Sequence, residues 1–129
     1  MKKLGILNRD IARVLASLGH TDQIVISDCG LPIPSNVECI DLSIRLGVPN
    51  FVDVLTEVLA DMEVELMMAA TEVRTESPSI HQELENRQIS IRYLPHDELK
   101  AETSKAKAII RTGECAPYAN VILRAGIIF

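Results

Sequence analysis

Short apolar segments rich in β-branched residues recur along the chain and alternate with amphipathic segments of about ten residues. Ile24-Val25-Ile26 is the clearest, because its apolar side chains point to both sides of an extended chain, as in a strand that is covered on both faces. Strands that alternate with helices indicate an α/β fold. We therefore expect a single domain over residues 1–129, with three layers: a mainly parallel central sheet and helices on both faces.

Capping residues and hydrophobic periodicity set the expected elements. Asn8 and Asn50 precede helical patterns, and Gly19 is expected to end the first helix as a C′ glycine. Ser77 before Pro78 predicts a further helix start. Helices are expected at about 9–18, 51–62 and 78–87 and from residue 96, and strands at 24–26, 38–42, 64–70, 89–94, 108–111 and 120–124.

Composition limits where the chain works and what it binds. Hydrophobic residues make up 47% of it and the mean hydropathy is +0.17, so we expect apolar surface to be buried between subunits as well as under helices. No apolar run approaches the roughly 18 residues of a membrane span, and no membrane partner is expected. The three cysteines are odd in number and lack C-x-x-C spacing, which indicates free thiols in a reducing compartment, the cytoplasm.

Several ligand classes lack their usual signatures. The net charge is −5, aromatic residues make up 3%, and there is no basic stripe, so nucleic acid is not expected. The six glycines form neither G-x-G-x-x-G nor a P-loop, and the three histidines form no H-x-x-x-H pair. We therefore expect no cofactor and no metal.

Three polar residues stand where a predicted strand or helix begins or ends. His20 lies between a helix end and a buried strand, where it either faces a cleft or caps the helix. Asp28 ends an apolar strand, where its carboxylate either binds a partner or forms an Asx turn. His96 follows Pro95 at a helix start, where a neutral imidazole is favoured, and it is either a site residue or a plain cap.

Other polar residues leave the same choice open. Tyr118 and Asn120 lie two residues apart, so on an extended chain both face one side. A phenol and an amide suit a polyhydroxylated ligand, and they also suit an ordinary turn. Lys100, one helical turn after His96, is either a further ligand-binding residue or a solvated lysine. His81 is interpreted as a solvated mid-helix position.

These polar residues belong to segments that resemble those of a known family. The chain resembles the D-ribose pyranase family, within the ribose and fucose mutarotases, over essentially its whole length. Six segments in order and at compatible spacing carry the resemblance: Lys2-Lys3 with 5–8, then 18–22, 28–34, 96–100, 110–120 and 125–129.

The resemblance implies interconversion of the pyranose and furanose forms of D-ribose without a cofactor. It implies His20 as the catalytic acid/base residue and Asp28, His96, Tyr118 and Asn120 as ribose-binding residues, with Lys100 as a further neighbour. It also implies ring-shaped homo-oligomers, such as a decamer of stacked pentamers, in which one subunit completes its neighbour's site.

Ring opening requires only proton transfers, which one positioned histidine can perform near neutral pH. We therefore expect His20 to move the proton and Asp28 to orient the His20 ring or hold a sugar hydroxyl. Three alternatives remain: an L-fucose mutarotase, a non-catalytic sugar-binding accessory of a ribose transport system, and a structural subunit whose polar residues lie far apart.

Overall fold

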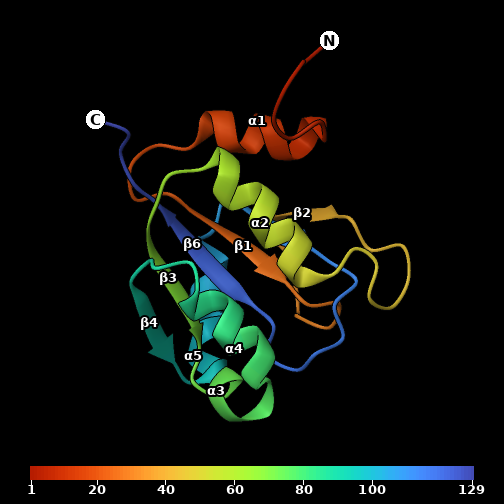
Figure 1. Ribbon diagram of the computed structural model, residues 1–129, viewed down its shortest axis with the longest axis vertical. Helices are drawn as coiled ribbons and strands as arrows, with labels where there is room; N and C mark the ends of the chain where they lie inside the picture. Colours follow the sequence, from red (N-terminus) through yellow and green to blue (C-terminus); the bar gives the residue numbers. More distant parts are fainter.

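The computed structural model describes residues 1–129 and consists of one six-stranded sheet with helices on both faces (Figure 1). The strands are β1 (Gln23–Ser27), β2 (Glu38–Asp41), β3 (Val64–Ala70), β4 (Ile91–Leu94), β5 (Ala108–Arg111) and β6 (Val121–Ala125). The helices are α1 (Arg9–Ser17), α2 (Phe51–Asp61), α3 (Val73–Glu76), α4 (Pro78–Glu85), α5 (His96–Glu102) and the 3₁₀ helix η1 (Thr103–Lys105). None of the helices has the length and apolar character that a bilayer crossing requires.

The sheet is mixed and mostly parallel, in the order β2-β5-β1-β6-β3-β4. The pairs β2–β5, β5–β1 and β3–β4 are parallel, whereas β6 runs antiparallel to both of its neighbours. The expected three-layer α/β architecture is confirmed. The antiparallel strand lies inside the sheet.

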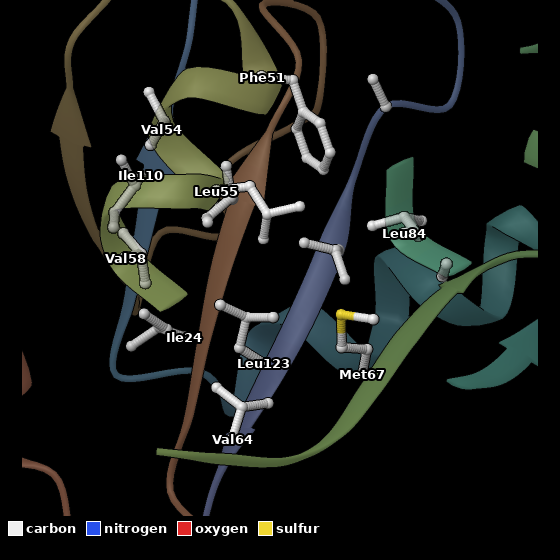
Figure 2. Packing of buried hydrophobic residues seen from close by; sticks show 14 of the residues in the cluster. Ile24, Phe51, Val54, Leu55, Val58, Val64, Met67, Leu84, Ile110 and Leu123 are labelled. Atoms are coloured by element: carbon white, nitrogen blue, oxygen red, sulfur yellow. The ribbon is translucent and has the colours of Figure 1, made fainter. Parts of the chain in front are cut away.

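Alternating side chains of the strands build two cores. Ile24 and Ile26 point into the larger cluster, which packs against α1, α2 and α4, while Val25 points into a smaller one with Leu99 of α5. Figure 2 shows side chains of α2, such as Leu55, and of the strands, such as Leu123 of β6, in the larger core. Each fully buried large apolar side chain contributes roughly 1.5–3 kcal/mol to folding. Burial on both faces explains why Ile24-Val25-Ile26 lacks polar alternation.

The two predicted asparagine caps are confirmed. The Asn8 Oδ1 accepts hydrogen bonds from the backbone N–H groups of Asp10 and Ile11, each at 3.0 Å. The Asn50 Oδ1 accepts one from the Asp53 N–H at 2.8 Å. Both caps satisfy donors that the first helical turn leaves free.

The ends of two helices differ from the prediction. α1 stops because Leu18 takes an extended conformation (φ −71°, ψ 135°), so Gly19 is not a left-handed C′ residue. The Gly19 N–H donates instead to the Asp22 carboxylate at 2.8 Å. Ser77 precedes α4 as predicted, but its hydroxyl donates to the Pro117 carbonyl at 2.6 Å and does not cap the helix.

Two further boundaries were not foreseen. The short helix α3 precedes α4, which ends at Glu85, two residues before the predicted end. β4 begins at Ile91 and not at residue 89, after a turn in which Gln88 has φ of 58°.

The segment from β5 to β6 matters most for function, because it passes over the carboxyl end of β1. β1 lies between β5 and β6 in the sheet, so residues 112–120 must cross it. The Thr112 hydroxyl and N–H both donate to the Ser27 carbonyl, at 2.7 and 3.0 Å. A Cβ at Gly113 would lie 2.5 Å from the Arg45 carbonyl oxygen, so this crossing admits only glycine.

Candidate functional site

Asp28 and Asn120 form a reciprocal pair at the carboxyl end of β1. The Asn120 Oδ1 accepts the Asp28 backbone N–H at 2.9 Å, and the Asn120 Nδ2 donates to Asp28 Oδ2 at 2.9 Å. The other carboxylate oxygen accepts the Gly30 N–H at 2.9 Å, which is the predicted Asx turn. Each carboxylate oxygen keeps a lone-pair direction for a ligand, so the turn and the binding role are compatible.

Arg111 of β5 fixes the backbone directly after Asp28. Its Nε and Nη2 donate to the Cys29 carbonyl at 3.1 and 2.8 Å, and its Nη1 donates to Asp41 Oδ2 of β2 at 2.9 Å. Hydrogen bonds from the Ser43 hydroxyl and N–H, and then from Arg111, lower the pKa of Asp41. The ionised pair ties β2, β5 and the end of β1 together.

His96 and Tyr118 approach Asp28 from two other elements. Their rings meet edge to face, with centroids 4.9 Å apart and an interplanar angle of 85°. The His96 Nδ1 is buried and has no hydrogen-bond partner. A buried polar atom without a partner is costly.

These residues line one hollow of about 240 Å³. Its walls come from the ends of β1 and β4 and from the β5–β6 segment: Asp28, Gly30, Leu31, Pro32, His96, Pro117, Tyr118 and Asn120. Carboxylate, imidazole, phenol and amide groups therefore converge on a space the size of a small molecule. Convergent polar groups of this kind suit a polyhydroxylated ligand.

Tyr118 reaches the hollow by a different route from the one predicted. Its φ is 61°, in the left-handed region, and its carbonyl accepts the Asn120 N–H at 2.8 Å. The segment is a tight turn and not an extended chain. The Ser77 hydroxyl holds this turn through Pro117, and such strain in a non-glycine residue is common at functional sites.

Lys100 lies on α5 but does not line the hollow. Its ammonium pairs with Asp97 at 2.9 Å and lowers the pKa of that carboxyl. The role of Lys100 in ligand binding stays a prediction. Its contacts within a single protomer do not support that role.

His20 lies at the other end of β1. About 16 Å of strand separates it from the Asp28 hollow, since β1 has five residues. It follows Gly19 in a turn closed by a hydrogen bond from the Asp22 N–H to the Gly19 carbonyl, in which Thr21 has φ of 72°. The expectation that Asp28 orients the His20 ring is therefore wrong within one protomer.

The partner of His20 is Glu65. The His20 Nε2 lies 2.9 Å from Glu65 Oε2, and Arg124 of β6 donates from Nε to Glu65 Oε1 at 2.7 Å. The hydrogen bond from His20, and then Arg124, lower the pKa of Glu65. The imidazole contacts no helix carbonyl, so the capping interpretation of His20 is not supported.

His81 is not the solvated residue that was predicted. Its side chain is 19% exposed, its Nδ1 lies 3.1 Å from Glu85 Oε1, and its Nε2 lies 2.7 Å from the Tyr93 hydroxyl. It joins α4 to the edge strand β4 and touches neither hollow.

Two carboxylates near the candidate residues were missed. Glu72 accepts the His96 backbone N–H through both oxygens, at 3.2 and 3.0 Å, and Glu65 contacts His20. Glu65 carried a signal: it is the one charged residue in the apolar run 64–70. Glu72 carried none, because its partner is a backbone group distant in sequence.

Comparisons with known proteins agree on one family. A curated D-ribose pyranase from Shouchella clausii is 98% identical over the full length of both chains. The structure of Bacillus subtilis RbsD complexed with D-ribose matches with a TM-score of 0.98 at 50% identity and covers all of both chains. The fucose mutarotase from Streptococcus pneumoniae, in complex with L-fucose, matches with a TM-score of 0.78 at 26% identity and covers 95% of each.

A family model spans nearly the whole chain. The model described as the RbsD / FucU transport protein family matches residues 1–128, which include the Asp28 hollow, His20 and its partners. The chain belongs to the RbsD / FucU transport protein family.

Proposed function

We propose that this chain is an isomerase that interconverts the pyranose and furanose forms of D-ribose. The strongest single support is the 98% full-length identity to a curated D-ribose pyranase. The near-superimposable relative whose structure holds D-ribose supports the same substrate. The hollow of about 240 Å³ supplies the hydroxyl-binding groups that such a sugar needs.

In this proposal ribose occupies the hollow formed by Asp28, His96, Tyr118 and Asn120. The Asp28 carboxylate accepts a sugar hydroxyl through its free lone pairs, and the His96 imidazole contacts another. The Tyr118 phenol and the Asn120 amide complete the walls. These groups hold the hydroxyls that do not react.

His20 transfers the protons. It comes from a neighbouring subunit, because its own hollow lies at the opposite end of β1. Association of subunits is supported by large apolar side chains that a lone chain leaves exposed: Leu4, Leu7, Ile44, Leu46, Ile128 and Phe129. Stacked pentameric rings are the assembly we propose, and the three free cysteines support a reducing, cytoplasmic location.

The reaction needs one base and one acid. His20 takes the proton from the anomeric hydroxyl, whose oxygen forms the aldehyde carbonyl as the bond from C1 to the ring oxygen breaks. The ring oxygen receives a proton and becomes a hydroxyl. Rotation presents a different hydroxyl to the aldehyde, and the reverse proton transfers close the other ring. A positioned acid/base residue contributes typically about 10²- to 10⁴-fold.

Saturation-transfer NMR on D-ribose tests the activity and the role of His20 together. Wild-type protein is expected to accelerate pyranose–furanose exchange, and His20→Ala is expected to lose about 10²- to 10⁴-fold of that acceleration. His81→Ala is the matched control, because it removes an imidazole that touches neither hollow. A folded His20→Ala protein with near-normal exchange would remove His20 from this role.

The same assay separates the other two functions. Faster exchange of L-fucose anomers than of ribose forms indicates a fucose mutarotase. Saturable ribose binding without faster exchange indicates a sugar-binding accessory of transport and overturns the proposed activity.

A further inference from the structure

The surroundings of His20 form a second hollow, of about 430 Å³. It lies between the end of α1, the end of α2 and the C-terminal segment, which leaves the sheet on the side of α1 (Figure 1). Its lining is mainly apolar, with Leu15, Leu18 and Met62 facing the tail residues Ile127, Ile128 and Phe129. In these surroundings the carboxylate of Glu65 is the group that contacts the imidazole.

A β-bulge places Glu65 beside His20. Val64 pairs with Ala125 and Leu66 pairs with Arg124, so Glu65 is an extra residue opposite two consecutive partners. Regular alternation would put Val64 and Met67 on opposite faces, yet both lie in the larger core. The bulge thus keeps Val64 buried and frees the Glu65 side chain to leave the ladder. Bulges commonly re-aim a side chain next to an active site.

The end of β6 and the glycine that follows it contact both the bulge and the turn that carries His20. A Cβ at Gly126 would lie 3.4 Å from the backbone nitrogen of Glu65, so a larger residue would crowd the bulge. The Ala125 carbonyl accepts the Thr21 N–H at 2.9 Å, and the Ala125 N–H donates to the Asp22 carbonyl at 2.8 Å. Ala125 therefore fixes the His20 turn directly opposite the bulge.

We propose that Glu65 is a positioning residue that holds the His20 imidazole by its Nε2–H, so that Nδ1 is the atom that exchanges protons with the sugar. This role rests on the proposed function. Arg124 binds the second oxygen of the carboxylate and prevents it from rotating away. A carboxylate that accepts one ring N–H fixes the tautomer and leaves the other nitrogen free as the base.

The negative charge of Glu65 also stabilises the imidazolium that forms in mid-reaction. When Nδ1 takes the anomeric proton, the ring becomes a cation, and its Nε2–H then donates to an anion at 2.9 Å. The proton passes from Nδ1 to the ring oxygen and the neutral ring returns. Glu65 itself gains and loses no proton, in accord with the lowering of its pKa.

Removing this charge without changing the shape gives the sharpest test. Glu65→Gln is expected to lower the ribose exchange rate at saturating sugar by about ten- to a hundred-fold. The Michaelis constant is expected to change little, because Glu65 contacts His20 and does not line the Asp28 hollow, where the sugar is proposed to bind. Glu65→Asp, which restores the charge on a shorter side chain, is expected to recover part of the loss.

The pH–rate profile provides a readout that a purely structural role would not move. The profile of Glu65→Gln is expected to differ from that of the wild type, because the substitution removes the anion that the imidazole contacts. Other charged groups lie near this ring: Asp61 and Glu63 line the same hollow, Arg124 binds Glu65, and Asp22 belongs to the turn that carries His20. Glu63→Gln makes the same charge change without a hydrogen bond to His20 and is the matched control.

A direct measurement does not depend on activity. Long-range ¹H–¹⁵N NMR of the His20 ring is expected to show the Nε2–H tautomer in wild-type protein and a mixture of tautomers in Glu65→Leu. A dominant Nδ1–H tautomer in the wild type overturns the assignment, and so does a Glu65→Gln protein with unchanged rate and profile. Absence of ribose exchange in the wild type defeats the proposed function instead, which keeps the two failures distinct.

Discussion

At Asp28 a single carboxylate has two structural partners and still faces the hollow. Its Oδ1 closes the turn to Gly30, and its Oδ2 receives the Asn120 amide. The amide is in turn held by the Asp28 N–H, so the pair locks the rotamers of both side chains. Side chains that are already fixed in this way reduce the entropy that is lost when a ligand binds.

Asn120→Ala is therefore expected to cost both stability and ribose affinity. Asn120 is 1% exposed, and its removal leaves the Asp28 N–H and one carboxylate oxygen without their partner. The expected loss in the free energy of unfolding is about 1–3 kcal/mol. Denaturant unfolding at fixed protein concentration and ribose titration measure the two effects. Asn86→Ala, an exposed amide paired with Gln82, is the control, and equal effects in both variants would contradict the prediction.

Single residues were predictable where a polar side chain interrupts an apolar run. Asp28 was identified in this way, and the same argument applies to Glu65 in the run 64–70. The bulge that re-aims Glu65 leaves no mark in the sequence. His81 was misread for a related reason, because its partner Tyr93 belongs to a strand twelve residues away.

Among the elements, α3 connects two walls of the Asp28 hollow. Glu72 at its start binds the N–H of His96, and Ser77 at its end binds the carbonyl of Pro117, next to Tyr118. Val73 between them is fully buried and anchors the segment in the core. One short helix thus sets the relative position of His96 and Tyr118.

Glu72→Ala is expected to raise the Michaelis constant for ribose several-fold while the rate at saturation changes less. The variant frees the first N–H of α5 and removes a negative charge from that helix start, at a cost of about 0.5–2 kcal/mol. The His20 region is unaffected, because Glu72 lies at the other end of the sheet. Ribose-dependent exchange kinetics measure the two constants separately. Glu76→Ala, on the exposed side of the same helix, is the control; a lower saturated rate with an unchanged Michaelis constant argues against this role.

Most elements were predictable from caps and periodicity, whereas the pairing of strands was not. The run 64–70 became β3 without change, because its apolar side chains are buried on both faces. β6 runs antiparallel to its neighbours, and β1 lies between β5 and β6. No local sequence pattern indicates which strand inserts between two others. That insertion is what brings Tyr118 and Asn120 to Asp28.

For the whole molecule, the two halves of the proposed site lie at opposite ends of the same sheet. The His20 hollow is mainly apolar and adjoins the exposed side chains of Ile128 and Phe129, whereas the Asp28 hollow is lined mainly by polar and proline residues. A contact that joins one end of a subunit to the other end of the next is heterologous, and such contacts form a ring when the rotation between subunits closes. The resemblance predicted rings, and a heterologous contact is the arrangement that would bring the two hollows of neighbouring subunits together.

Mixing two inactive variants tests this arrangement. His20→Ala keeps the ribose hollow and lacks the proton-transfer residue, while Asp28→Asn keeps His20 and lacks the sugar-binding carboxylate. In mixed rings, an Asp28→Asn subunit places its His20 against the intact hollow of a His20→Ala neighbour. Subunits that are unfolded together and refolded at equal amounts are expected to regain about one quarter of wild-type exchange, because each intact site needs the right subunit on both sides of one contact.

The double variant refolded with wild type gives the reference for random mixing. If sites were complete within each subunit, the mixture of single variants would stay as inactive as its components, and the ring would have no part in catalysis.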